Sequence, residues 1–94
     1  MAFGVVKQHI SLGGGMSAVL NQVTGDGSTQ TWDTGLRKVM FYTATTADDA
    51  HCIADEWYLN YSDGGSTAKD GAVHFDEAAP DDGEVWYCFG IGKL

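Results

Sequence analysis

Residues 84–91 read Glu-Val-Trp-Tyr-Cys-Phe-Gly-Ile, and this stretch decides the fold class. Both alternating sets of side chains are bulky or apolar: Val85, Tyr87, Phe89 and Ile91 in one set, Trp86, Cys88 and Gly90 in the other. Because alternate side chains of a β-strand point to opposite faces, neither face of this strand suits water. The pattern predicts a central strand, covered on one side by a second sheet and on the other by a partner subunit.

The rest of the chain has the same character. Short runs rich in β-branched and aromatic residues alternate with turns that contain many of the 13 glycines. Strands at intervals of about 8–12 residues are typical of sandwiches and barrels, and no long helical spacing of apolar side chains occurs. We therefore expect an all-β fold, either a small antiparallel β-sandwich or a jelly-roll-like barrel. Alternation alone does not give the strand order that would separate these two forms.

Turns divide the chain into its expected strands. Runs 17–24 and 29–34 flank Gly25-Asp26-Gly27-Ser28 and are predicted to pair as a hairpin. Further strands are expected at 36–45, 53–61 and 73–75. Three consecutive glycines, Gly13 to Gly15, set off the N-terminal part. We expect residues 1–15 to be an arm or extension, or else a strand, and residues 16–94 to be a single β domain.

Charge excludes two classes of partner. The 94 residues include 13 Asp and Glu against 5 Lys and Arg, a net charge of −8. Such a surface repels phosphate backbones and anionic membranes, so neither nucleic acid nor a membrane is expected as a partner. No secretory signal or membrane-spanning run is recognisable, which predicts synthesis in a cytoplasm. Cys52 and Cys88 are then expected as reduced thiols rather than as a disulfide.

The residues give little support to catalysis or to a bound cofactor. His51 and Cys52 are adjacent, which on a strand points them to opposite faces and rules out a simple nucleophile–base pair. No zinc-binding spacing occurs. Aspartates at the turns could hold calcium, but none follows a calcium-loop pattern. We predict no enzyme, no cofactor and no catalytic or metal-binding residue. A lectin-like sugar- or calcium-binding domain, with tryptophans as a platform, is kept as an alternative.

Contact with other proteins is the function class that remains. On the N-terminal run, the residues expected to touch a partner are Phe3, Val5, Val6 and Ile10. On the strands, Trp86 is the best interface candidate, since its neighbours already fill the opposite face. In the run 36–45, Val39, Phe41 and Thr43 should share one face and Lys38, Met40 and Tyr42 the other. Met40 and Tyr42 are therefore also expected at the interface.

One stretch resembles a known group of proteins. Residues 23–39 read Val-Thr-Gly-Asp-Gly-Ser-Thr-Gln-Thr-Trp-Asp-Thr-Gly-Leu-Arg-Lys-Val, similar to small virion proteins of tailed phages. Residues 60–66 and 89–94 resemble them too, so the resemblance covers most of residues 17–94. It implies a β-sandwich or jelly-roll-like subunit of a virus particle, with capsid decoration as the first choice. It also implies trimers or dimers, and it supplies no catalytic residue.

The sequence thus predicts a virion structural protein made in a host cytoplasm and located on the capsid surface. It would bind the major capsid protein or other virion proteins and stabilise the shell as a decoration or cement subunit. A tail, fibre or receptor-binding module is the alternative.

Overall fold

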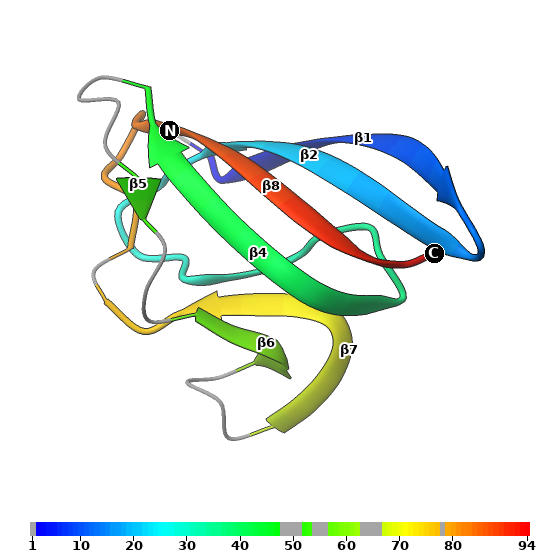
Figure 1. The fold of residues 1–94 in the computed structure, drawn as a ribbon. Coiled ribbons are helices and arrows are strands. Elements are labelled where there is room, and N and C mark those ends of the chain that lie inside the picture. Colours follow the sequence, from blue (N-terminus) through cyan, green and yellow to red (C-terminus); the bar gives the residue numbers. More distant parts are fainter. Residues whose placement is uncertain (1, 48–51, 54–56, 63–66, 78) are drawn as a thin grey trace.

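The computed structural model describes residues 2–47, 52–53, 57–62, 67–77 and 79–94 (Figure 1). These residues form an all-β structure, and no helix that could span a lipid bilayer occurs among them. The strands of the described residues are β1 (Gly4–Gly13), β2 (Met16–Thr24), β3 (Thr31–Asp33), β4 (Lys38–Thr46), β5 (Cys52–Ile53), β6 (Trp57–Ser62), β7 (Thr67–Phe75) and β8 (Val85–Lys93).

Two antiparallel sheets make up the fold. The larger has the order β1-β2-β8-β4-β5 and the smaller the order β3-β7-β6. β8 is the middle strand of the larger sheet, paired on one side with β2 and on the other with β4. The prediction of a central strand at residues 84–91 is therefore confirmed. Because the sheets remain separate and enclose one core, the fold is the sandwich of the two expected forms.

The core between the sheets is dominated by aromatic rings. Trp32 of β3, Trp57 of β6 and Trp86 of β8 meet nearly edge to face, with ring centroids 5.6–6.4 Å apart. Phe75 lies 4.9 Å from Trp57 and 5.3 Å from Trp86. Each such pair contributes about 0.5–1.5 kcal/mol beyond the burial of its area. The other buried members of the cluster are Val19, Val23, Leu36, Val39, Tyr42, Ala44, Val73 and Cys88.

The prediction that runs 17–24 and 29–34 pair as a hairpin is wrong. β2 pairs with β1 and β8 in the larger sheet, whereas β3 pairs with β7 in the smaller. The turn at residues 25–28 therefore carries the chain from one sheet to the other. A side chain does not fit at Gly25, because its Cβ would lie 2.5 Å from the backbone oxygens of Pro80 and Asp81.

Asp26 holds this crossing in shape. Its carboxylate accepts hydrogen bonds from the backbone N–H groups of Ser28, at 2.9 Å, and Thr29, at 2.7 Å. The Thr29 hydroxyl donates a further bond of 2.7 Å. These bonds favour the charged form, and the backbone bond from Thr29 contributes most. Together they lower the pKa of Asp26 from 3.8 to about 2.

We expect this turn to weaken in acid. The folded-state pKa of Asp26 lies below its unfolded value of 3.8, so its stabilising effect is complete above that pH and is lost as the pH falls toward 2. An NMR titration of the Asp26 carboxyl carbon should have its midpoint near 2 in the wild type. Thr29→Val, which removes only the hydroxyl bond, should raise that midpoint. A wild-type midpoint near 3.8 would contradict the assignment.

Residues 4–13, expected as an arm or a strand, form the edge strand β1. β1 pairs with β2 from Gly4 opposite Thr24 to Gly13 opposite Met16. The three glycines of the connection have φ angles of +62° to +83°, which favour glycine. The boundary expected at residue 15 therefore falls at the end of a hairpin connection within the larger sheet.

A bulge changes which residues of β4 face the core. The pairing of β4 with β8 shifts between Val39 and Phe41. As a result Val39 and Tyr42 are both buried, while Met40 and Phe41 are exposed. The predicted faces, Val39 with Phe41 and Met40 with Tyr42, are therefore wrong, because the inserted residue reverses the alternation after Val39.

The strand expected at 53–61 is two strands in different sheets, β5 and β6; residues 54–56 lie outside the described part. Asn60 of β6 has φ +62°, at an irregularity in the pairing with β7. Its side chain accepts a hydrogen bond from the Val39 N–H, at 2.8 Å, and donates one to the Val39 oxygen, at 2.9 Å. Asn60 thus bonds β4 as a neighbouring strand would and ties the two sheets together.

Candidate protein-interaction surface

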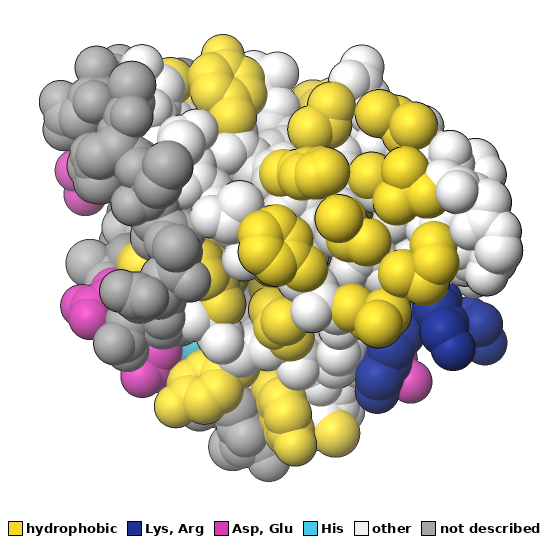
Figure 2. Space-filling model, in the orientation of Figure 1, with side chains coloured by type: hydrophobic (Ala, Val, Ile, Leu, Met, Phe, Trp, Pro, Cys, Tyr) yellow, Lys and Arg dark blue, Asp and Glu magenta, His cyan; other side chains and the backbone are white. Residues whose placement is uncertain are grey.

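The side of the larger sheet that turns away from the core is its candidate functional surface. The side chains of β1, β2, β8 and β4 that point away from the core form a surface that we call the outer face. The register places them in three rows across the strands: Val6–Gln22–Tyr87–Thr45, then Gln8–Leu20–Phe89–Thr43, then Ile10–Ala18–Ile91–Phe41. Figure 2 looks onto this face and shows hydrophobic side chains spread over it.

The outer face is apolar for a solvent-exposed surface. Val6, Ile10, Leu20, Phe41 and Tyr87 are each 42–58% exposed, and Phe89 and Ile91 are partly exposed. With about 200 Å² for a fully exposed aromatic side chain and less for an aliphatic one, these seven offer on the order of 500 Å² of apolar surface. This is the size of the largest patch on a typical monomer, about 300–600 Å², and such a patch is often functional.

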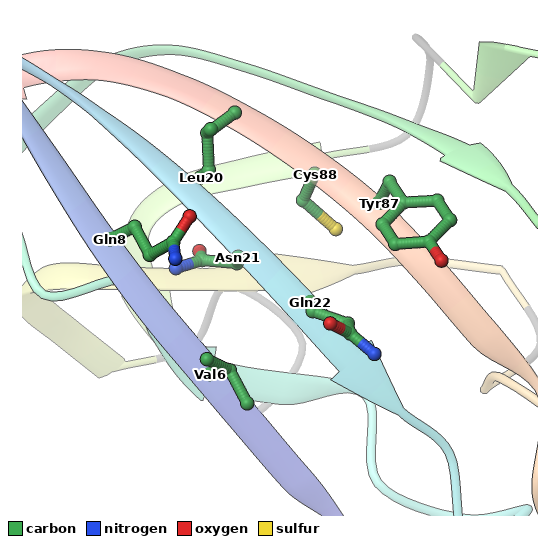
Figure 3. A pocket seen from close by; sticks show the side chains of 7 residues that line it. All are labelled: Val6, Gln8, Leu20, Asn21, Gln22, Tyr87 and Cys88. Atoms are coloured by element: carbon green, nitrogen blue, oxygen red, sulfur yellow. The ribbon is translucent and has the colours of Figure 1, made fainter.

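A hollow of about 200 Å³ interrupts the outer face above β2 (Figure 3). Val6 and Gln8 of β1 line one side and Tyr87 of β8 the other, with Leu20 and Gln22 of β2 between them. Pockets for drug-sized ligands measure about 300–1,000 Å³. This hollow therefore suits a single protruding side chain from another surface better than a free small molecule.

Charge is unevenly placed at the ends of the outer face. Arg37, Lys38 and Lys93 lie together where β4 begins and β8 ends. Figure 2 shows Lys and Arg side chains gathered at one corner of the face. Three of the chain's five cationic residues thus share one corner. Lys38 pairs with Asp70 at 3.2 Å. At the other end, exposed Asp81 and Asp82 come shortly before β8, and Figure 2 shows acidic side chains along that edge.

The structure divides the residues predicted for the interface into three groups. Val6, Ile10 and Met40 are 53–59% exposed and available to a partner, the first two on the outer face. Phe3 and Val5 are partly buried against the core, and the ring of Phe3 lies 5.7 Å from that of Trp32. Tyr42 and Trp86 are only 5% and 4% exposed, so their assignment to an interface is wrong.

Tyr42 belongs to a buried polar network. Its hydroxyl accepts a hydrogen bond from Trp32 Nε1 at 2.9 Å and donates one to Asn21 Oδ1 at 2.7 Å. Asn21 Nδ2 donates in turn to the Thr34 oxygen at 3.1 Å. Burial raises the pKa of Tyr42, which keeps the hydroxyl protonated. The network joins the larger sheet to the smaller through the core.

Trp86 faces inward because its side of β8 also carries the glycines that permit close packing. Trp86, Cys88, Gly90 and Gly92 are all buried. A Cβ at Gly90 would lie 2.8 Å from the Tyr42 ring, and one at Gly92 would overlap the backbone of Lys38. Sequence reasoning missed Leu20, Phe41, Tyr87, Phe89 and Ile91 as surface residues. The glycines at alternate positions were the signal that could have identified the inner side.

Little in the described residues suggests chemistry. Burial raises the pKa of the Cys88 thiol to about 12, so it stays protonated and a poor nucleophile at neutral pH. Cys88 is unpaired, and the side chain of Cys52 lies outside the described part. No group of three His, Cys, Asp or Glu residues gathers within the described ranges.

The comparisons with known proteins add no relative to this picture. No family model matches the chain, and neither the curated proteins nor the solved structures contain a match.

Proposed function

We propose that this protein is a structural subunit of a virus particle, a capsid decoration or cement subunit that binds the major capsid protein and stabilises the assembled shell. The observation that carries the proposal is the outer face, on the order of 500 Å² of exposed apolar side chains on one continuous sheet. Such a surface is better suited to contact with protein than with water. The virion as its setting rests on the resemblance of most of residues 17–94 to small phage virion proteins.

The proposed mechanism is binding that depends on assembly. A subunit that binds the complete shell, and not free capsid protein, shifts the assembly equilibrium toward the shell by mass action. It needs no reacting group, only a folded surface of stable shape. The sandwich with its aromatic core supplies that surface.

Purified protein is expected to bind mature shells and raise their rupture temperature. Tyr87→Ser, which removes a 55% exposed ring from the outer face, should weaken shell binding by about tenfold. Tyr61→Ser, which removes a 42% exposed ring from the smaller sheet, is the matched control and should leave binding unchanged. Electron microscopy of particles should show many copies over the capsid.

Other outcomes would redirect the assignment. Binding to tail tubes, or a few copies at one vertex, would contradict the capsid role and favour a tail, fibre or receptor-binding module. A lectin-like function predicts that tryptophan fluorescence responds to glycans or calcium. The burial of Trp32 and Trp86 argues against a sugar platform built from these rings.

A further inference from the structure

We infer that the cationic corner, formed by the side chains of Arg37, Lys38 and Lys93, binds carboxylate groups of an acidic segment of the major capsid protein. This partner assignment rests on the proposed function, because it names the chemistry that the capsid surface must offer at one end of the outer face. Three features of the corner support it: its place on the sheet, its cost to the fold and its excess of positive charge.

The cationic corner extends the outer face by one row. Beyond the row that ends with Phe41, the register places Met16 of β2, Lys93 of β8 and Lys38 of β4 beside one another. Lys93 follows Ile91 by two residues on β8, so the two side chains point to the same side of the sheet. A partner that covers the apolar rows therefore also meets the lysines.

The two lysines oppose each other within the fold. Lys38 and Lys93 lie directly opposite in the pairing of β4 with β8, and like charges in such a pair are destabilising. Arg37 adds a third positive charge beside them, since its N–H donates a hydrogen bond of 2.7 Å to the Lys93 oxygen. A neutral or acidic side chain at position 93 would suit the fold better. Lys93 therefore serves a contact outside the fold.

The corner carries more positive charge than the fold neutralises. Asp70 of β7 lies in the corner and pairs with Lys38 at 3.2 Å. Within the described residues, neither Arg37 nor Lys93 forms an ion pair. The four side chains line an open hollow of about 300 Å³, which has room for an acidic side chain of another protein. The planar guanidinium of an arginine matches the two oxygens of a carboxylate.

A protein carboxylate fits this place better than a phosphate backbone does. The apolar rows beside the corner suit contact with protein, and carboxylates are the anionic groups of protein surfaces. A nucleic acid would extend beyond the corner and meet a chain whose net charge is −8. A few carboxylates on a folded surface match the small extent of the corner.

The corner also fixes the direction in which the partner lies. An acidic segment is attracted to the end of the outer face where β8 finishes. Exposed Asp81 and Asp82, shortly before β8 begins, would repel the same segment at the other end. Complementary charge gives an interface its register and excludes the reversed arrangement. The apolar rows then supply the contact and the corner its orientation.

Two variants with the same change in net charge test the corner on mature shells. Near 0.1 M salt, Lys93→Glu should weaken shell binding about fivefold more than Lys69→Glu, which alters an exposed position on β7. Near 1 M salt, where charges are screened beyond about 3 Å, this difference should nearly vanish. Lys93→Glu should also raise the unfolding temperature, because it replaces a pair of like charges by a pair of opposite charges.

Equal shell affinities of the two variants, with the wild type bound, would overturn the carboxylate contact and leave the proposed function standing. Weaker binding by Lys93→Glu together with a lower unfolding temperature would also overturn it, since damage to the fold would then explain the loss.

Failure of the wild type to bind shells would overturn the proposed function, and an NMR titration with the peptide tetraglutamate then decides the corner. The backbone amides of Lys38 and Lys93 should shift more with tetraglutamate than with tetraglutamine, and Lys93→Glu should remove the difference. Equal shifts with the two peptides would overturn the carboxylate site.

Discussion

Gly71→Ala is expected to cost at least about 4 kcal/mol of folding free energy, a large share of the roughly 5–15 kcal/mol by which such a domain is stable. Gly71 has φ +85°, which is unfavourable for any residue with a Cβ. The added methyl group would also overlap the backbone carbonyl of Leu36, which has no flexible end that could move aside. The Gly71 oxygen accepts hydrogen bonds from both the N–H and the hydroxyl of Thr34, at 2.9 and 2.7 Å. A shift of the backbone at Gly71 would therefore also weaken the two bonds that hold the chain directly after β3.

Gly83→Ala is the matched control for this experiment. Gly83 has nearly the same φ, +83°, but nothing lies within 4 Å of where its Cβ would be. It should therefore show only the backbone cost, about 1–2 kcal/mol. Urea denaturation followed by tryptophan fluorescence measures both. Similar losses for the two variants would show that the close approach to Leu36 is unimportant.

Tyr42→Phe is expected to destabilise the fold by about 2–6 kcal/mol, although it removes a single oxygen atom. The change leaves two buried groups without their partner: the Nε1–H of Trp32 and the Oδ1 of Asn21. Each unsatisfied buried group costs about 1–3 kcal/mol. The phenyl ring keeps its packing 4.9 Å from Trp57, so the loss comes from hydrogen bonding and not from a cavity.

Tyr87→Phe makes the same chemical change on the outer face and serves as its control. Tyr87 is 55% exposed, so water can replace whatever its hydroxyl bonds, and the free energy of unfolding should change by less than about 0.5 kcal/mol. Thermal and urea denaturation of the two variants, side by side, measure the difference. A loss below about 1 kcal/mol for Tyr42→Phe would mean that water or a relaxed side chain satisfies the orphaned groups.

The sequence predicts the fold class and the central strand correctly, but it does not predict which strands pair with each other. Alternation in residues 84–91 identified the central strand, because a strand with bulky groups on both sides needs cover on both. The turn at residues 25–28 was recognised as a turn, but a turn signal is local. Whether the chain returns alongside the previous strand or crosses to another sheet depends on partners such as β8, about 60 residues away.

The sequence predicts that apolar side chains are exposed on the strands, but it misplaces some of the residues that expose them. Two of the side chains that it names for contact, Trp86 and Tyr42, are buried in the core. Residue size alone suggests that a large ring on a crowded strand belongs to a partner. The bulge after Val39 reverses the faces of β4, and nothing in the alternation of residues 36–45 announces an inserted residue.

The central place of β8 also governs when the protein can fold during its synthesis. Its two neighbours, β2 and β4, lie far from it in the sequence. The paired residues range from Thr46 with Trp86, the least separated, to Met16 with Lys93, the most separated. Until residues 85–93 have left the ribosome, the emerging chain holds two long strands whose shared partner does not yet exist. Native pairings this distant make folding slow, and unpaired apolar strands are prone to aggregate meanwhile. The larger sheet can therefore be completed only after translation has passed its last strand.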